Sequence, residues 1–259
     1  MTAGKILIIL SDANKFPVKK DTGNEDHASG FFLTELAKPL KKILKAGYEV
    51  TFTAPRGREP LPDPISDTLL AFAGNFIERH IERKLIDRMR RENGFSKPRP
   101  FVTINDRELA TFAGVFIPGG HAPLQDLGAD RELGRILRHF HSNSKPTAAI
   151  CHGPYALLST MQYGDGSFPY IGYKMTSWSD AEENMMEKLL RGEIPKVESA
   201  LREAGAEMME GYKEKAGCIT VDRELVTGGN PLAANSLGNQ FLEMLRNDAE
   251  ADGVADGSA

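Results

Sequence analysis

Residues 147–158 are Thr-Ala-Ala-Ile-Cys-His-Gly-Pro-Tyr-Ala-Leu-Leu, and they predict a short buried strand that turns sharply into a helix. The apolar run ends just before Cys151, and Pro154 suits the first position of a helix. Cys151, His152 and Gly153 therefore occupy the turn. Such a strand–turn–helix is typical of a nucleophile elbow, which presents a reactive side chain above a sheet. The positive end of the expected helix dipole would favour a thiolate at Cys151.

Strand and helix patterns alternate on both sides of this turn. An apolar run at residues 5–10, a helical pattern at 31–46 that stops at Gly47, and a strand pattern at 48–53 form a βαβ unit. Such a unit implies parallel strands. Further strands are predicted at residues 113–117, 218–221 and 225–227, and further helices at 131–140, 195–204 and 231–245. The fold class is therefore α/β, with a doubly wound, mostly parallel sheet sandwiched by helices.

Three segments lack this alternation. Residues 13–29 are polar and have the composition of a loop. Residues 55–100 are proline-rich at both ends and charged within, which predicts a helical insertion that serves as a lid or an interface. Residues 247–259 are acidic and aperiodic, which predicts a disordered tail. We therefore expect one α/β domain over residues 1–246.

Composition and charge restrict the class of protein. The chain has 259 residues and a net charge of −4, so nothing favours nucleic acid or an anionic membrane as a partner. No apolar run is long enough to span a bilayer, and the apolar run near the start is too short for a signal peptide. Two cysteines, Cys151 and Cys218, form no disulfide framework, so we expect a reducing, cytoplasmic location. Cys218 begins an apolar strand and is expected to pack there.

A Gly-Gly pair follows the strand predicted at residues 113–117. Glycines directly after a parallel strand leave backbone N–H groups unencumbered, which suits an oxyanion hole. The amides of Gly120 and His152 would be its two donors. The alternative is that the pair only makes a tight turn.

Glu35 lies in a mostly apolar segment near the start of the first predicted helix. Ligand chemistry in open α/β sheets gathers at the carboxyl edge of the strands, where this helix begins. A desolvated glutamate there would have a raised pKa and could hydrogen-bond the thiolate or relay protons. The alternative is an ordinary exposed helix glutamate.

The positions of the histidines exclude one catalytic arrangement. Histidines occur at His27, His80, His121, His139, His141 and His152. None follows residue 152, so a papain-like order with a distant downstream base is impossible. His152 itself could act as a base if an acid from residues 180–183 orients it. His139 and His141 are expected to be solvated, and His80 has no second ligand at metal-binding spacing. We therefore expect no metal site.

Five motifs carry a family resemblance. They are Ser-Gly-Phe-Phe-Leu-Thr-Glu at 29–35, Phe-Ile-Pro-Gly-Gly-His at 116–121, Ala-Ile-Cys-His-Gly-Pro at 149–154, Ser-Asp-Ala-Glu-Glu at 179–183, and Leu-Val-Thr-Gly-Gly-Asn-Pro-Leu-Ala-Ala-Asn at 225–235. Together they resemble the PfpI superfamily, which is class I glutamine amidotransferase-like. Within it, they resemble the branch of heat-inducible chaperones and glutathione-independent glyoxalases (glyoxalase III).

The resemblance implies a flavodoxin-like fold and a set of site residues. By matching position, Cys151 would be the nucleophile, His152 its partner and Glu35 the nearby acid. Glu183 would orient His152, with Asp180 as the fallback. Some chaperones of the branch bind a metal through two histidines and a glutamate. Here Leu44 stands where one histidine is expected, although Glu49 could match the glutamate, so metal binding does not carry over.

The resemblance also implies an activity. The substrate would be a 2-oxoaldehyde such as methylglyoxal, converted to D-lactate without glutathione and without a diffusible cofactor. A homodimer is expected. Alternatives are a protein deglycase, a holdase-type stress chaperone that binds unfolded client proteins, and a protein whose cysteine senses oxidation. A cysteine peptidase or amidase is the weakest alternative, because no downstream histidine completes the usual triad.

Overall fold

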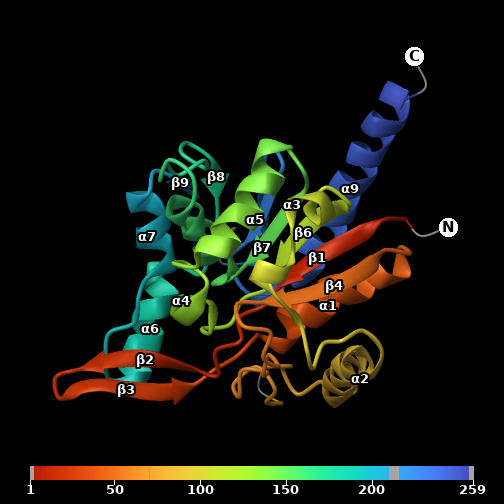
Figure 1. Ribbon diagram of the computed structural model, residues 1–259. Coiled ribbons are helices and arrows are strands. Elements are labelled where there is room, and N and C mark those ends of the chain that lie inside the picture. The colour runs from red at the N-terminus through yellow and green to blue at the C-terminus, as the bar shows by residue number, and fades with distance from the viewer. Residues whose placement is uncertain (1–2, 70, 210–215, 257–259) are drawn as a thin grey trace.

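The computed structural model describes residues 3–69, 71–209 and 216–256, and a seven-stranded sheet forms its centre (Figure 1). The strand order is β10-β11-β7-β6-β1-β4-β5. Neighbouring strands pair in parallel except β10 and β11, which are antiparallel. The strands are β1 (Lys5–Ile9), β2 (Lys15–Lys20), β3 (Gly23–Ala28), β4 (Glu49–Ala54), β5 (Arg99–Pro100), β6 (Phe112–Ile117), β7 (Thr147–Ile150), β8 (Lys174–Met175), β9 (Glu207–Met208), β10 (Ile219–Asp222) and β11 (Leu225–Gly228). The predicted fold class is confirmed.

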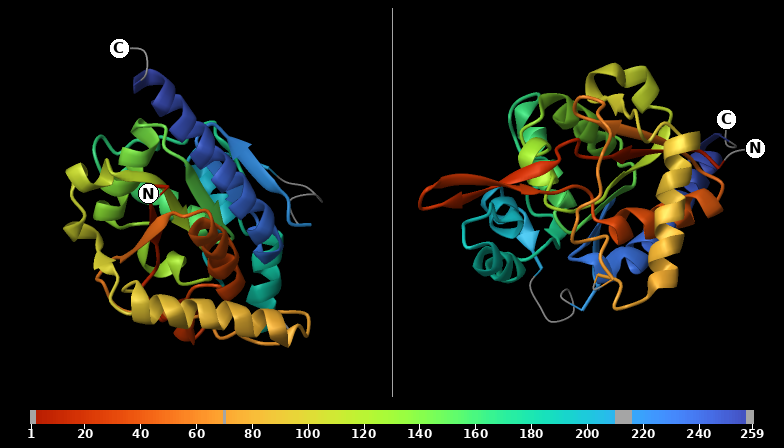
Figure 2. Two further views of the ribbon diagram at one scale, coloured as in Figure 1. Left: turned by 90° about the vertical axis from the view of Figure 1, so that its right-hand side faces the viewer. Right: turned by 90° about the horizontal axis from the view of Figure 1, so that it is seen from below.

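Helices cover both faces of this sheet (Figure 2). The α-helices are α1 (Leu33–Lys45), α2 (Phe76–Glu92), α3 (Asp106–Leu109), α4 (Pro123–Asp126), α5 (Arg131–Ser142), α6 (Asp180–Leu190), α7 (Val197–Glu203) and α9 (Ala234–Asp256). The 3₁₀ helices are η1 (Phe101–Thr103), η2 (Gly153–Gln162) and η3 (Pro231–Ala233). None of the helices among the described residues is long and apolar enough to cross a membrane.

Alternate residues of β1 supply the two halves of the core. Ile6 and Ile8 belong to the cluster that α1 and α9 cover. Leu7 and Ile9 belong to the cluster on the opposite face, with α5 and η2. Successive side chains of a strand point to opposite faces, so a continuous apolar run is required for a strand that is covered on both sides.

Helix α9 packs closely on β6 at Gly114. A Cβ atom added there would lie 2.9 Å from a methyl of Leu245 and 3.1 Å from the ring of Phe241. The absence of a side chain at Gly114 thus lets two apolar residues of α9 approach the sheet backbone.

The segment 13–29, expected to be a loop, contains the hairpin of β2 and β3 instead. The hairpin extends away from the body of the molecule (Figure 1). Phe16 and Val18 are buried and pack with Ile194. Most of the other residues of the hairpin are polar and face solvent, so the apolar alternation is confined to two residues and the composition suggested a loop.

Residues 247–256, expected to begin a disordered tail, continue helix α9 to Asp256. Extending an existing helix fixes one residue for each new hydrogen bond, and the alanines here favour the helix. Residues 257–259 lie outside the described part of the chain.

Three side chains differ from expectation. Cys218, expected to begin a strand and pack there, is exposed, and it lies just before β10 at the edge of the sheet. His139 and His141, expected to be solvated, are half-buried. His141 Nδ1 lies 2.8 Å from the carboxylate of Glu224, and burial lowers the pKa of His139. Both histidines lie at the end of α5, where neighbouring elements cover them.

Replacing Phe241 with alanine should lower the free energy of unfolding by about 3–5 kcal/mol, because it empties the contact between α9 and the sheet. Denaturant titration measures this change. The control is Leu232→Ala, since Leu232 is 70% exposed, and it should cost less than about 0.5 kcal/mol. Equal losses in the two variants would contradict the described packing of α9.

Candidate active site

Cys151 directly follows β7 and has a left-handed backbone with φ of 61°. A residue with a side chain adopts this conformation only when its surroundings hold it there. Here the Cys151 N–H donates to the carbonyl of Gly228 (2.8 Å), and the Cys151 carbonyl accepts from the N–H of Trp178 (2.9 Å). The strand and the sharp turn are those that the sequence predicted. The helix that follows is the 3₁₀ helix η2 rather than the expected α-helix.

His152 and Glu183 form a buried pair beside the sulfur. His152 Nε2 lies 2.8 Å from Glu183 Oε2, and His152 Nδ1 lies 3.2 Å from Cys151 Sγ. Burial, together with the nearby His121, lowers the pKa of His152 to about 4. Burial would raise the pKa of Glu183, but hydrogen bonds from His121 and His152 outweigh it and lower this pKa to about 2. At neutral pH a neutral His152 therefore donates Nε2–H to a carboxylate and turns the lone pair of Nδ1 toward sulfur.

Glu35 is the second acid beside Cys151. Its side chain is fully buried, and its Oε2 accepts a hydrogen bond from the Gly119 N–H (3.1 Å). Burial raises the pKa of Glu35 to about 8, although the contacts with Cys151 and Gly119 act in the opposite direction. At neutral pH the carboxyl group is therefore mostly protonated. It can donate a hydrogen bond to the sulfur and can also release its proton at low cost.

The pKa of the Cys151 thiol is raised, which differs from the expected thiolate-favouring turn. Burial is the largest cause, followed by the charge of an ionised Glu35. The backbone N–H groups of Gly120 and His152 lower it. Because Glu35 is mostly protonated at neutral pH, its charge is then largely absent. The titrations of Glu35 and Cys151 are thus coupled to each other.

Glycine is required at positions 119 and 120, which follow β6 and Pro118. A Cβ atom at Gly119 would lie 2.6 Å from Glu35 Oε2 and 2.7 Å from the Cβ of Cys151. Gly120 has a φ of 99°, and a Cβ atom there would lie 2.1 Å from the carbonyl of Gly30. The two positions therefore bring backbone N–H groups against Glu35 and the sulfur, where a side chain would separate them.

His121 was not assigned a role from the sequence, yet it belongs to the site. Its Nε2 lies 3.3 Å from Glu183 Oε1, and its ring lies 4.2 Å from that of His152. Phe16 of the hairpin stacks on His121 at 4.7 Å. The sequence signal that could have identified His121 is its position directly after the Gly-Gly pair. Asp180, the fallback for Glu183, instead bonds the hydroxyl and N–H of Ser199.

His121, His152 and Glu183 also place ligand atoms within 4.8 Å of one another, close enough for a metal ion among the described residues. A metal ion there would bind the carboxylate of Glu183, which otherwise orients His152. Both imidazoles already hydrogen-bond that carboxylate, so the arrangement is accounted for by the pair itself. The absence of a metal stays a prediction.

The raised pKa of Glu35 has a consequence for stability. Between its ordinary pKa of 4.5 and about 8, the folded protein holds a proton that the unfolded chain has lost. The contribution of Glu35 to stability therefore falls as pH rises through this window. Glu35→Gln lacks this titration. As the pH rises from 5 to 8, the free energy of unfolding of the variant should therefore increase by about 3 kcal/mol relative to that of wild type. Denaturant titration at each pH measures it, and parallel curves would contradict the buried proton.

Comparisons with known proteins show which family this chain resembles. The model of the DJ-1/PfpI family matches residues 27–244. The chain is 29% identical to the glutathione-independent glyoxalase hsp3101 of Schizosaccharomyces pombe, over 93% of this chain and 96% of that protein. It is 26% identical to the protein/nucleic acid deglycase HchA of Pseudomonas aeruginosa, over 84% of this chain and 74% of that protein.

A solved structure of glyoxalase III from Candida albicans shares the fold. Its TM-score is 0.73 at 19% sequence identity, and the match covers 93% of this chain and 97% of that one. The resemblance drawn from the sequence motifs is thus confirmed. With the family match extending over most of the sequence, this chain belongs to the DJ-1/PfpI family.

Proposed function

We propose that the protein is a glutathione-independent glyoxalase that converts methylglyoxal, or a similar 2-oxoaldehyde, to a 2-hydroxy acid such as D-lactate. One observation carries the proposal: Cys151 interacts with a buried, mostly protonated Glu35 and with a neutral His152 that Glu183 orients. Relatives named as glyoxalases and deglycases support an enzyme.

The first step is attack of sulfur on the aldehyde carbon. His152 Nδ1 accepts the thiol proton, and Glu183 stabilises the imidazolium that forms. The amides of Gly120 and His152 face the sulfur, so they would hold the oxygen as it becomes negative. The imidazolium then returns its proton to this oxygen, which gives a neutral hemithioacetal.

The second step moves hydrogen between the two carbons of the substrate. Neutral His152 removes the proton from the hemithioacetal carbon while Glu35 protonates the ketone oxygen, which gives an enediol. Glu35 then takes back a hydroxyl proton, and the imidazolium protonates the second carbon. The product is the thioester of a 2-hydroxy acid, so one carbon is oxidised and its neighbour reduced. Water hydrolyses the thioester and restores the thiol.

The pKa of about 8 suits Glu35 to this task. Proton transfer is most efficient when the pKa of the catalytic group lies near the working pH, because both forms are then accessible. An exposed glutamate would be ionised and could not donate. The pKa of Glu183 is about 2, so it stays an anion, and that of His152 is about 4, so it is a neutral base. The pKa of Glu35 is about 8, so it is an acid at neutral pH.

Deglycation is a second candidate function, because the HchA relatives are named protein/nucleic acid deglycases. It would use the same cysteine and glutamate on a larger substrate. A holdase activity would use another surface. Several large apolar side chains between residues 61 and 81 are exposed, and such a patch suits a dimer partner or an unfolded client.

Lactate formation from methylglyoxal without glutathione tests the main proposal. Wild type should be active, and Cys151→Ala and Glu35→Gln should each lose about 10³-fold or more in kcat/KM. The matched control is Cys218→Ala, which removes an exposed thiol and should keep full activity. No lactate from any of the four proteins would overturn the glyoxalase proposal. Activity on a glycated substrate freed of residual aldehyde would then identify a deglycase. Holdase activity that is retained in Cys151→Ala would identify a chaperone.

A paired substitution tests which acid orients His152. Glu183→Gln should lower kcat by about 10²–10⁴-fold, because the amide can no longer stabilise the imidazolium or select its tautomer. Asp180→Asn should stay near wild type, since Asp180 bonds Ser199. Steady-state kinetics on variants with native circular dichroism provide the measurement. The reverse order of effects would assign the role to Asp180.

A further inference from the structure

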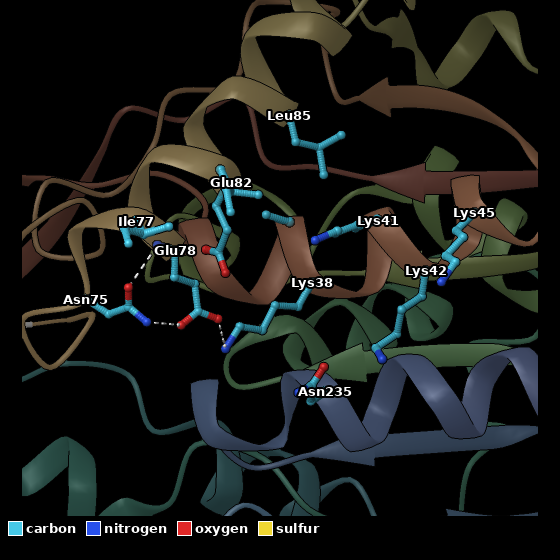
Figure 3. A pocket seen from close by; sticks show the side chains of 12 residues that line it. Lys38, Lys41, Lys42, Lys45, Asn75, Ile77, Glu78, Glu82, Leu85 and Asn235 are labelled. Carbon is cyan, nitrogen blue, oxygen red and sulfur yellow. Dashed lines mark hydrogen bonds and ion pairs between the residues drawn. The ribbon is translucent and has the colours of Figure 1, made fainter.

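Helix α1 presents a row of lysines to a pocket of about 550 Å³ that lies between α1, α2 and the start of α9 (Figure 3). The lysines are Lys38, Lys41, Lys42 and Lys45, at spacings that place them along one side of the helix. The facing wall on α2 includes the apolar side chains of Ile77, Ile81 and Leu85. Cys151, Glu35, His152 and Glu183 do not line this pocket, so it is separate from the candidate active site.

The positive charge of this row is only partly balanced. Lys38 pairs with Glu78 at 2.8 Å, and Lys42 donates to the side-chain oxygen of Asn239 at 2.7 Å. Lys41 and Lys45 make no hydrogen bond or ion pair with the described residues. Like charges three and four residues apart on a helix repel one another, so an anion bound at this row would relieve that repulsion.

Glu82 of α2 adds a buried polar atom to the pocket wall. Its side chain is 5% exposed, and its Oε2 accepts a hydrogen bond from Thr34 Oγ1 at 2.9 Å. Its Oε1 is buried and has no partner. Burial raises the pKa of Glu82 to about 7, with Thr34 and Lys38 acting in the opposite direction, so near neutral pH a proton can reside on the carboxyl group.

Lys41 and Lys45 are hydrogen-bond donors, and Glu82 is one as well when it carries its proton. Figure 3 shows Lys41 extending from α1 toward the side of the pocket where Glu82 lies. Together these donors match a ligand rich in acceptor oxygens rather than a cation.

We propose that this α1–α2 pocket binds a small organic diphosphate, with its phosphates on Lys41 and Lys45 and an apolar group against Ile81 and Leu85. Lys41 and Lys45 lie one helical turn apart on α1, so their long, flexible side chains can both reach a small group of linked phosphates. Ile81 and Leu85 have the same spacing on α2 and offer an apolar surface to a ring. The pocket volume falls within the range of small-molecule sites, about 300–1,000 Å³.

Isothermal titration of the full chain with pyrophosphate and with ADP, at constant ionic strength, tests the proposal. Both should bind saturably at one site, and ADP should bind more tightly because its base adds apolar contact. Lys41→Gln combined with Lys45→Gln should weaken binding by about tenfold for each lysine. The matched control combines Lys5→Gln with Lys188→Gln, two exposed lysines outside the pocket, and should bind as wild type.

Protection from an amine-acetylating reagent provides a second readout on the unmodified protein. Pyrophosphate should slow the acetylation of Lys41 and Lys45, mapped by mass spectrometry, and leave Lys5 and Lys188 unchanged. The proposal is overturned if neither ligand binds saturably, or if the control variant weakens binding as much as the pocket variant. It is also overturned if single-stranded RNA or anionic vesicles protect these lysines and ADP does not compete.

Discussion

The left-handed backbone at Cys151 is the constraint on which the site depends. A residue with a side chain does not hold this conformation unaided, and here β11 and the segment before α6 fix it through hydrogen bonds on both sides of the residue. The turn directs the sulfur toward Glu35 and the amide of Gly120, and places the His152 ring beside it. The same geometry needs the two glycines after β6, which let the backbone approach Cys151 and Glu35, and the buried start of α1, which carries Glu35.

Burial then separates the roles of the ionisable groups. The same low-dielectric environment raises the pKa of Glu35, which has no cationic partner, and lowers that of His152. Glu183 stays anionic because two imidazoles hydrogen-bond its carboxylate. Two glutamates of one site thus have opposite protonation states at neutral pH.

The hairpin connects the surface of the molecule to this chemistry. Phe16 stacks on His121, and His121 shares the carboxylate of Glu183 with His152. The ring of Trp178 stacks on the other imidazole at 5.5 Å. These aromatic contacts hold both imidazoles in place.

The sequence by itself determined the parallel α/β sheet, the turn at Cys151 and the glycines that approach it, because apolar periodicity and turn residues act over a few positions. It also singled out Glu35, from its apolar surroundings at the start of the first helix, and Glu183, through a motif of the family. Only the tertiary structure decided that Glu35 keeps a proton, that His121 joins the site, and that residues 13–29 form a hairpin. Desolvation and contacts between distant segments produce these features, and no local pattern records how deeply a carboxyl group will be buried or what will lie beside it.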